Sequence, residues 1–148
     1  MNDDEQAAGL AETPGYRYAD VVGDQLFVAG QVPHDSAGAL VGVGDPALQA
    51  TTCLDNLARV IAVHDFDLAD IRQLVVYVVG EHQNLLDAWD AVRSWFDGSV
   101  PPATLLGVNL LGYGEQLVEI DATIVRLGSP MTPSLAGQSI DHQPQDID

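Results

Sequence analysis

The chain contains no lysine, and all five of its basic side chains are arginines. Without a side-chain amine the protein cannot form a Schiff base with a substrate carbonyl, so lysine-based covalent catalysis is excluded. Against these five cations stand 22 carboxylates, which give a formal net charge of −17. Such an excess of negative charge repels nucleic acids and anionic lipids, so we expect neither nucleic acid nor a membrane as a partner.

Cysteine and long apolar stretches are also scarce. Cys53 is the single cysteine, which excludes an internal disulfide and a metal site built from cysteines. Its position within a helical pattern is typical of a small core residue, with a reactive thiol as the alternative. No apolar run approaches the roughly 20 residues of a membrane-spanning helix. The acidic start, Met1 to Gln6, is the reverse of a signal peptide, so we expect a cytoplasmic location.

What the sequence does contain is the pattern of one folded domain. A length of 148 residues with 47% hydrophobic residues is typical of a single globular domain. Residues 1–13 are polar and lead into a Thr-Pro-Gly turn, so we expect a flexible N-terminal arm. The periodic pattern covers residues 14–127, which we take as the domain. Residues 128–148 are rich in Ser, Pro, Gln and Asp and are expected to form a disordered tail.

The hydrophobic periodicity predicts an α+β fold. Asp45 followed by Pro46 is a good helix start, and Gly98 a good helix stop. Strands alternate with these helices in the order strand, strand, helix, strand, helix, strand, strand. The predicted elements span residues 16–22, 25–32, 45–64, 72–79, 82–96, 103–110 and 116–126. This order indicates a mixed β-sheet, and two helices can cover only one of its faces.

The last strand indicates what the two faces of the sheet carry. Side chains alternate between faces along a strand, so the row from Val118 to Ile124 suits packing under the helices. Glu119 and Asp121 then lie on the uncovered face. We expect Ala103 and every second residue after it to form the matching row on the neighbouring strand. A partly apolar face without helices indicates self-association.

Two separated segments resemble the RidA/YjgF family. The first runs from Gly23 to Pro33 and reads Gly-Asp-Gln-Leu-Phe-Val-Ala-Gly-Gln-Val-Pro; the second runs from Pro101 to Val108 and is followed by Leu117 to Ala122. The resemblance extends over roughly residues 14–127. It implies a RidA-like, chorismate-mutase-like fold in a homotrimer with a barrel-like core and a cleft at each subunit interface. It further implies a hydrolase that deaminates small enamines and imines without a cofactor or a metal.

The same resemblance assigns residues to that cleft. It implies Glu119 and Tyr16 as catalytic residues, Glu119 positioning water. It places substrate-binding positions at Gly30, Gln31, Ala103, Thr104 and Leu105. Active members of the family carry an arginine at the position of Ala103, where it binds the substrate carboxylate. A methyl group cannot replace the paired hydrogen bonds of a guanidinium, so the usual 2-imino acids are not expected as substrates, unless an arginine from a neighbouring subunit compensates.

Several alternatives stay open at this level. Glu119 is either a water-orienting base or a carboxylate bound to backbone amides at a subunit boundary, and Tyr16 either lines the cleft or closes the first strand. Tyr113 is expected to be a loop or packing residue. The function itself is either hydrolysis of an imine without the usual anchor, or non-catalytic binding of a small ligand or a partner protein by a trimer.

Overall fold

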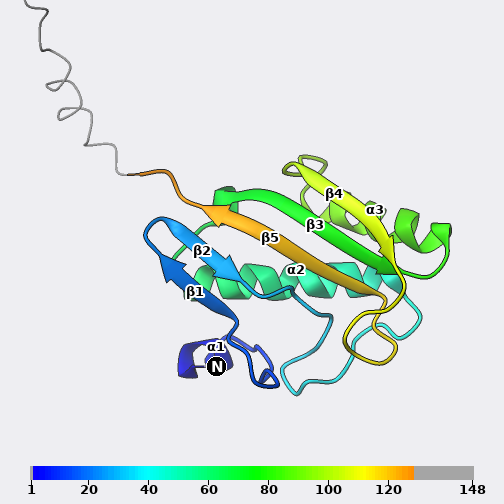
Figure 1. Cartoon of the computed structure of the whole chain (residues 1–148), viewed down its shortest axis with the longest axis horizontal. Coiled ribbons are helices and arrows are strands. Elements are labelled where there is room, and N and C mark those ends of the chain that lie inside the picture. The colour runs from blue at the N-terminus through cyan, green and yellow to red at the C-terminus, as the bar shows by residue number, and fades with distance from the viewer. Residues whose placement is uncertain (1, 129–148) are drawn as a thin grey trace, which may run out of the picture.

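The computed structural model describes residues 2–128 and is an α+β fold (Figure 1). Its elements are α1 (Asp3–Ala7), β1 (Ala19–Val22), β2 (Gln25–Val28), α2 (Pro46–Val63), a 3₁₀ turn (Leu68–Asp70), β3 (Ile71–Val79), α3 (His82–Trp95), β4 (Ala103–Val108) and β5 (Val118–Val125). The predicted tail lies outside the described residues, apart from Gly128. Within the described part, no helix is both long enough and apolar enough to cross a membrane.

The strands form one mixed sheet in the order β1-β2-β5-β3-β4, as the α+β prediction requires. Neighbouring strands are antiparallel except β3 and β4, which are parallel. Helices α2 and α3 both lie behind the sheet in Figure 1 and leave the opposite face uncovered. Helix α2 begins as predicted, because the Asp45 side chain accepts a hydrogen bond of 3.0 Å from the Leu48 amide and Pro46 opens the first turn.

The hydrophobic core fills the space between these two helices and the sheet. Cys53 lies in it, fully buried, and burial raises the pKa of its thiol well above the ordinary value. The prediction of a core cysteine is therefore confirmed. Strand β5 contributes to the core the alternating row of side chains that was predicted for it. The core residues at 1% exposure or less include Leu26, Leu54, Leu57, Ile61, Leu74, Val76, Val78, Val118, Ile120 and Ile124.

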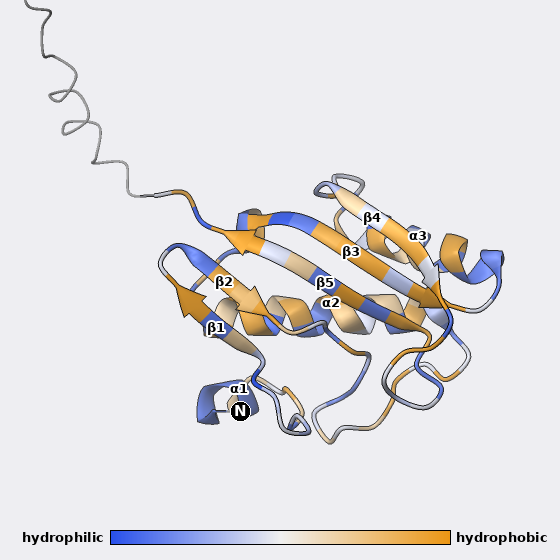
Figure 2. Ribbon diagram, viewed as in Figure 1, coloured by the Kyte–Doolittle hydropathy of each residue, from blue (hydrophilic) through white to orange (hydrophobic). Residues whose placement is uncertain are grey.

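The uncovered face of the sheet carries the polar positions of β5. Glu119 and Asp121 alternate with the fully buried Val118 and Ile120. Figure 2 shows hydrophilic bands along β5, a strand that is otherwise mostly hydrophobic. The prediction that Glu119 and Asp121 lie on the uncovered face is therefore confirmed.

Ala103, in contrast, lies on the other face from the one expected. Strand β4 pairs with β3, and in this parallel register Ala103 lies opposite Leu74 and Leu105 opposite Val76. Paired residues share a face, and both β3 partners are fully buried beneath the helices. The expectation that Ala103 and Leu105 line the open face beside Glu119 is wrong, because neither strand order nor register is visible in a single strand's pattern. The β4 residues on the open face are Thr104, Leu106 and Val108.

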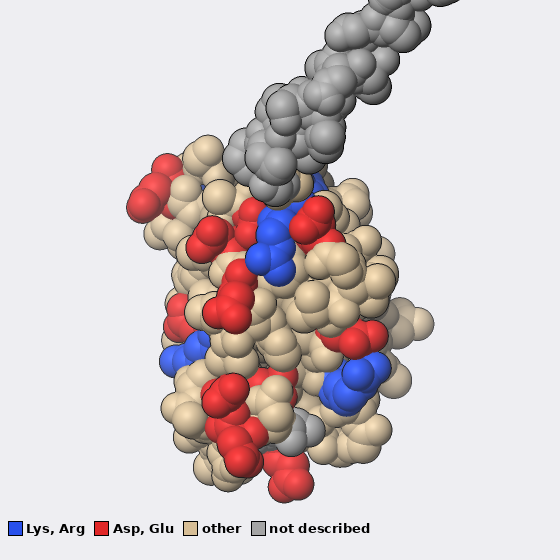
Figure 3. All heavy atoms as spheres, turned by 90° about the vertical axis from the view of Figure 1, so that its left-hand side faces the viewer, with Lys and Arg blue, Asp and Glu red and all other residues tan. Residues whose placement is uncertain are grey.

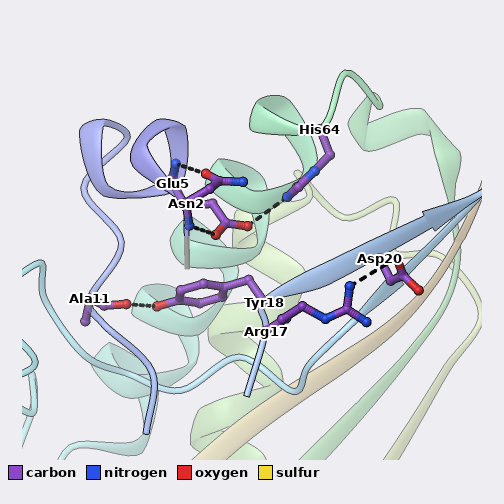
Figure 4. A network of polar contacts seen from close by, with 7 residues as sticks. All are labelled: Asn2, Glu5, Ala11, Arg17, Tyr18, Asp20 and His64. Carbon is purple, nitrogen blue, oxygen red and sulfur yellow. Dashed lines mark hydrogen bonds and ion pairs between the residues drawn. The ribbon is translucent and has the colours of Figure 1, made fainter. Parts of the chain in front are cut away.

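The N-terminal segment, expected to be a loose arm, contains helix α1 and packs on the domain. Asn2 and Glu5 form a capping box that closes the first turn of α1. The buried Glu5 carboxylate also contacts the His64 ring at 2.8 Å, at the C-terminal end of α2 (Figure 4). Leu10 and Tyr18 then form a small apolar cluster with Val60 of α2. The polar composition conceals these contacts, because the partners lie far away in the sequence.

Tyr18 provides a test of how much this anchoring contributes to stability. Its buried hydroxyl donates a hydrogen bond of 2.6 Å to the Ala11 carbonyl (Figure 4). Burial raises the pKa of Tyr18 to about 12, so the hydroxyl keeps its proton. We expect Tyr18→Phe to lower the free energy of unfolding by about 1–2 kcal/mol, because the buried carbonyl is left without its donor. Urea denaturation measures this change.

Tyr77→Phe is the matched control. The Tyr77 hydroxyl makes no hydrogen bond within residues 2–128, so its removal should change stability by less than about 0.5 kcal/mol. Equal stability changes in the two variants would show that the Ala11 contact contributes little.

Candidate functional site

Glu119 is held at the centre of the candidate site by its own strand and by the segment after β2. Its neighbours Val118 and Ile120 are fixed in the core. Gln31 pairs with Ile120 in both directions, with N···O distances of 2.7 and 3.1 Å. This pairing brings Gly30 against the Glu119 side chain, where a Cβ atom on residue 30 would overlap the carboxylate. Only glycine leaves room for the acid in this position.

The surroundings of Glu119 favour its protonated form. Burial raises the pKa of Glu119, the hydrogen bond from Gln116 partly lowers it, and the nearby Asp121 carboxylate raises it further. The net shift is upward. A carboxylate whose pKa moves toward neutrality accepts a proton more readily than an ordinary glutamate, which is the property that a general base needs.

Tyr16 lies near enough to this acid to sense its charge, and it interacts with a second tyrosine, Tyr113. Burial raises the pKa of Tyr16 well above its ordinary value, and a hydrogen bond with the Tyr113 side chain adds to the shift, with a smaller contribution from Glu119. Both effects keep the Tyr16 hydroxyl protonated as a donor. The Tyr113 ring in turn meets the His34 ring edge-on at 4.5 Å. Burial lowers the pKa of His34, so its imidazole is neutral near pH 7.

A cavity of about 620 Å³ opens next to these rings. Three segments line it, namely the chain before β1, the turn between β2 and α2, and the loop before β5. Its lining residues are Glu12, Thr13, Pro14, His34, Gly38, Leu40, Tyr113 and Gly114. Tyr16 lines an adjoining hollow of about 380 Å³ that shares Glu12 and Thr13 with it. A small molecule can therefore lie against the two tyrosines.

Gln116 connects the loop that carries Tyr113 to the acid. Its side chain accepts a hydrogen bond of 3.2 Å from the Tyr113 amide and donates to the Val118 carbonyl at 3.0 Å and to Glu119 Oε1 at 3.3 Å. The sequence reasoning missed Gln116 and took Tyr113 for a loop or packing residue. The available signal was a tyrosine between two glycines just before the strand that bears the acid.

A second buried glutamine holds the same loop in place. Gln49 of α2 is fully buried, and its side-chain oxygen accepts hydrogen bonds from the Leu117 and Val118 amides at 2.7 and 3.2 Å. Its side-chain nitrogen donates to the Gly42 and Glu115 carbonyls at 2.9 and 3.2 Å. All four hydrogen-bonding positions of the amide are therefore occupied. Gln49 joins α2 to both loops that border the site.

Comparison with known proteins identifies the chain at the level of its family. The family described as Endoribonuclease L-PSP matches residues 8–126, which include every site residue described above. This chain belongs to the L-PSP family. A RutC family protein of Sulfurisphaera tokodaii is 28% identical over 88 residues, which cover 60% of this chain and 69% of the relative. Protein DfrA of Myxococcus xanthus is 28% identical over 105 residues, covering 70% and 77%.

Solved structures confirm the L-PSP fold and the resemblance to RidA/YjgF proteins. The YjgF gene product of Escherichia coli superposes with a TM-score of 0.72 at 22% identity, covering 81% of this chain and 95% of that one. Escherichia coli TdcF with bound serine superposes with a TM-score of 0.72 at 20% identity, covering 81% and 94%. At these identities the likeness establishes the fold.

The predicted substrate-binding residues of this L-PSP chain fall into two groups. Gly30 and Gln31 lie beside Glu119, as described above. Ala103, Thr104 and Leu105 lie on β4, and β3 separates them from β5. A single chain therefore brings Tyr16, Gly30, Gln31 and Glu119 together, whereas the β4 residues stay apart from them.

Each of the five arginines has a partner within the chain, and none of these partners is Glu119. Arg17 pairs with Asp20 at 3.4 Å, and Arg93 with Asp90 at 3.8 Å. Arg59 donates a hydrogen bond to the Asn56 side chain. Arg72 contacts the Val125 carbonyl and Asp70. Arg126 contacts Asp24 and the Asp65 carbonyl and lies over the Phe66 ring. In the view of Figure 3, each arginine patch lies beside carboxylates.

Proposed function

We propose that this protein hydrolyses the C=N bond of a small imine or enamine that lacks the usual carboxylate anchor. The observation that carries the proposal is the Glu119 carboxylate, whose pKa is raised and which lies against Gly30 next to the Tyr16–Tyr113 pair. In the proposed reaction, a water molecule adds to the imine carbon while Glu119 accepts a proton from that water. The proton then passes to the nitrogen, and the C–N bond breaks to release an amine and a carbonyl compound. No cofactor takes part.

The proposed catalytic unit is a homotrimer with its cleft between subunits. Two observations support it. Thr104, the implied β4 residue on the open face, is separated from Glu119 by β3 within one chain, so a second subunit would be needed to bring it to the acid. The open sheet face also exposes apolar side chains, among them Phe27 at 51% and Leu106 at 36%. Light scattering should give three times the chain mass; a protein that hydrolyses imines at the mass of a single chain would contradict this arrangement.

Turnover of a panel of imines tests the proposal. Imines generated in solution by an amine oxidase are trapped with semicarbazide, and the protein should reduce the trapped fraction by hydrolysing them first. We expect acceleration for imines without a carboxylate. Absence of acceleration across neutral, cationic and anionic members of the panel would refute hydrolase function.

Restoring the missing cation is a complementary prediction. Each charge-assisted hydrogen bond to a carboxylate contributes about 1.5–3 kcal/mol. Thr104 is the β4 substrate-binding position on the open face of the sheet, next to Ala103. We therefore expect Thr104→Arg to raise kcat/KM for 2-iminobutanoate by about tenfold or more. Thr104→Gln supplies a long polar side chain without charge and should produce no such gain. Equal kinetics for both variants would mean that position 104 does not reach the substrate.

The missing anchor also supports a second candidate, a trimer that binds a small ligand or a partner protein without turnover. Saturable thermal stabilisation by imines or their keto products, without hydrolysis, would favour the ligand-binding form. RNA cleavage, which the family description names, is disfavoured here because a net charge of −17 opposes phosphate binding.

A further inference from the structure

Carboxylates outnumber cationic side chains around the candidate site. Glu119 and Asp121 lie on the same face of β5, and Glu12 lines both hollows that border Tyr16 and Tyr113. His34, which lines the larger cavity, is neutral near pH 7 because burial lowers its pKa. The larger cavity has no lysine or arginine in its lining. Arg17 borders the smaller hollow, but it is exposed and paired with Asp20.

An anion entering the larger cavity meets the Glu12 carboxylate and neither lysine nor arginine, whereas a cation meets complementary charge. Aromatic rings add to the preference, because Tyr113 lines the larger cavity and Tyr16 the adjoining hollow, and a tyrosine ring attracts a cation within about 6 Å of its centre. The net charge of −17 also concentrates cations near the whole surface. The cavity differs from the general surface in placing Glu12 and aromatic rings on the walls of one small volume.

We propose that the site takes its substrate as a cation, an iminium ion or an imine bearing a separate ammonium group, without a carboxylate. This proposal rests on the proposed hydrolase function and specifies its substrate class. For an iminium ion the balanced reaction is R₂C=NHR′⁺ + H₂O → R₂C=O + R′NH₃⁺. The water oxygen bonds to carbon, its protons pass through Glu119 to nitrogen, and the C–N bond breaks with the positive charge leaving on the amine.

Binding of stable ring compounds tests the charge preference directly. Piperidine, tetrahydropyran and tetrahydropyran-2-carboxylate share a six-membered ring and are cationic, neutral and anionic near neutral pH. In ligand-detected NMR titrations of the full chain, we expect piperidine to bind about tenfold more tightly than tetrahydropyran, and the anion to bind most weakly. Equal or tighter binding of the neutral or anionic ring would overturn the proposal.

Matched charge variants assign the preference to this cavity rather than to the overall charge. Glu12→Gln removes a carboxylate from the cavity wall, and we expect it to weaken piperidine binding about threefold while tetrahydropyran binding is unaffected. Asp97→Asn removes the same charge at the exposed end of α3, where φ is +53°, a conformation that asparagine tolerates. It should leave both affinities unchanged. Equal losses of piperidine affinity in the two variants, or no loss in Glu12→Gln, would overturn the assignment.

Turnover separates this inference from the proposed function. Hydrolysis of 2-iminobutanoate but not of an iminium ion would refute the cationic substrate class and leave hydrolase function standing. Selective cation binding without hydrolysis of any imine would refute the hydrolase and leave a cation-binding cavity. Faster hydrolysis of the iminium ion supports both.

Discussion

Replacing Glu119 by glutamine is expected to lower the rate of imine hydrolysis by about 100-fold or more, because a general base typically contributes about 10²–10⁴ to the rate. The amide keeps the shape of the side chain and its contacts with Gly30 and Gln116 but cannot accept a proton from water. The measurement is kcat for the best imine of the panel. Full activity in Glu119→Gln would remove Glu119 from the mechanism.

The pH profile of the same variant is a separate readout. Because burial raises the pKa of Glu119, activity should increase with pH through a value above the ordinary glutamate pKa of about 4.3. This rise should be absent from the residual activity of Glu119→Gln. Asp121→Asn is the control, since its charge raises the pKa of Glu119 without taking a proton from water. We expect it to keep most of the activity and to move the rise to lower pH.

Measuring the stability of Glu119→Gln distinguishes a loss of catalysis from a loss of the folded structure. A carboxyl group whose pKa is higher in the folded than in the unfolded protein stabilises the fold below its unfolded pKa. That contribution is lost as pH rises through the folded pKa. Glutamine has no such dependence, so near neutral pH Glu119→Gln should unfold at the same temperature as the original protein or at a higher one. A lower unfolding temperature would indicate that the ionised acid stabilises the loop.

The second large effect is expected at Gln49. Replacing it by methionine, which has a similar length, should lower the free energy of unfolding by about 3–5 kcal/mol. The reason is that buried amides and carbonyls lose their partners, at about 1–3 kcal/mol for each unsatisfied group. This is a large share of the about 5–15 kcal/mol that stabilises a typical domain. Chemical denaturation followed by circular dichroism measures the change.

Gln83→Met is the matched control for Gln49→Met. Gln83 lies exposed on α3 and makes a single hydrogen bond of 2.9 Å to Asp87. Its replacement should change stability by less than about 0.5 kcal/mol. If Gln49→Met behaved in the same way, the four hydrogen bonds of Gln49 would contribute nothing beyond what water supplies in the unfolded chain.

The local elements were predictable because their causes are local. Asp45 and Pro46 start α2 through contacts within one turn, and the alternation around Glu119 records which side of β5 is buried. The placement of Ala103 was not predictable in this way. It depends on β4 lying beside β3 in a parallel register, in which Leu105 packs against the core.

The residues of the candidate site also fall into a predictable and an unpredictable group. Glu119, Tyr16 and Gly30 were proposed from the resemblance; the structure places Gly30 against Glu119, and Tyr16 near enough to sense its charge. Tyr113 and Gln116 belong to a loop whose path follows from hydrogen bonds to the β5 end and to Gln49, contacts that no periodic pattern records. The contact between Glu5 and His64 was missed for the same reason, since 59 positions separate the two residues.

The anchoring of α1 bears on how the protein is to be produced. A recombinant version trimmed to the family match would begin at residue 8 and lose Glu5, leaving His64 without its carboxylate partner. The same trimming would shorten the stretch that presents Glu12 and Tyr16, so the trimmed chain would be a poor substitute for the full chain in assays of binding and turnover. Purification tags are better joined after the last residue than before the first.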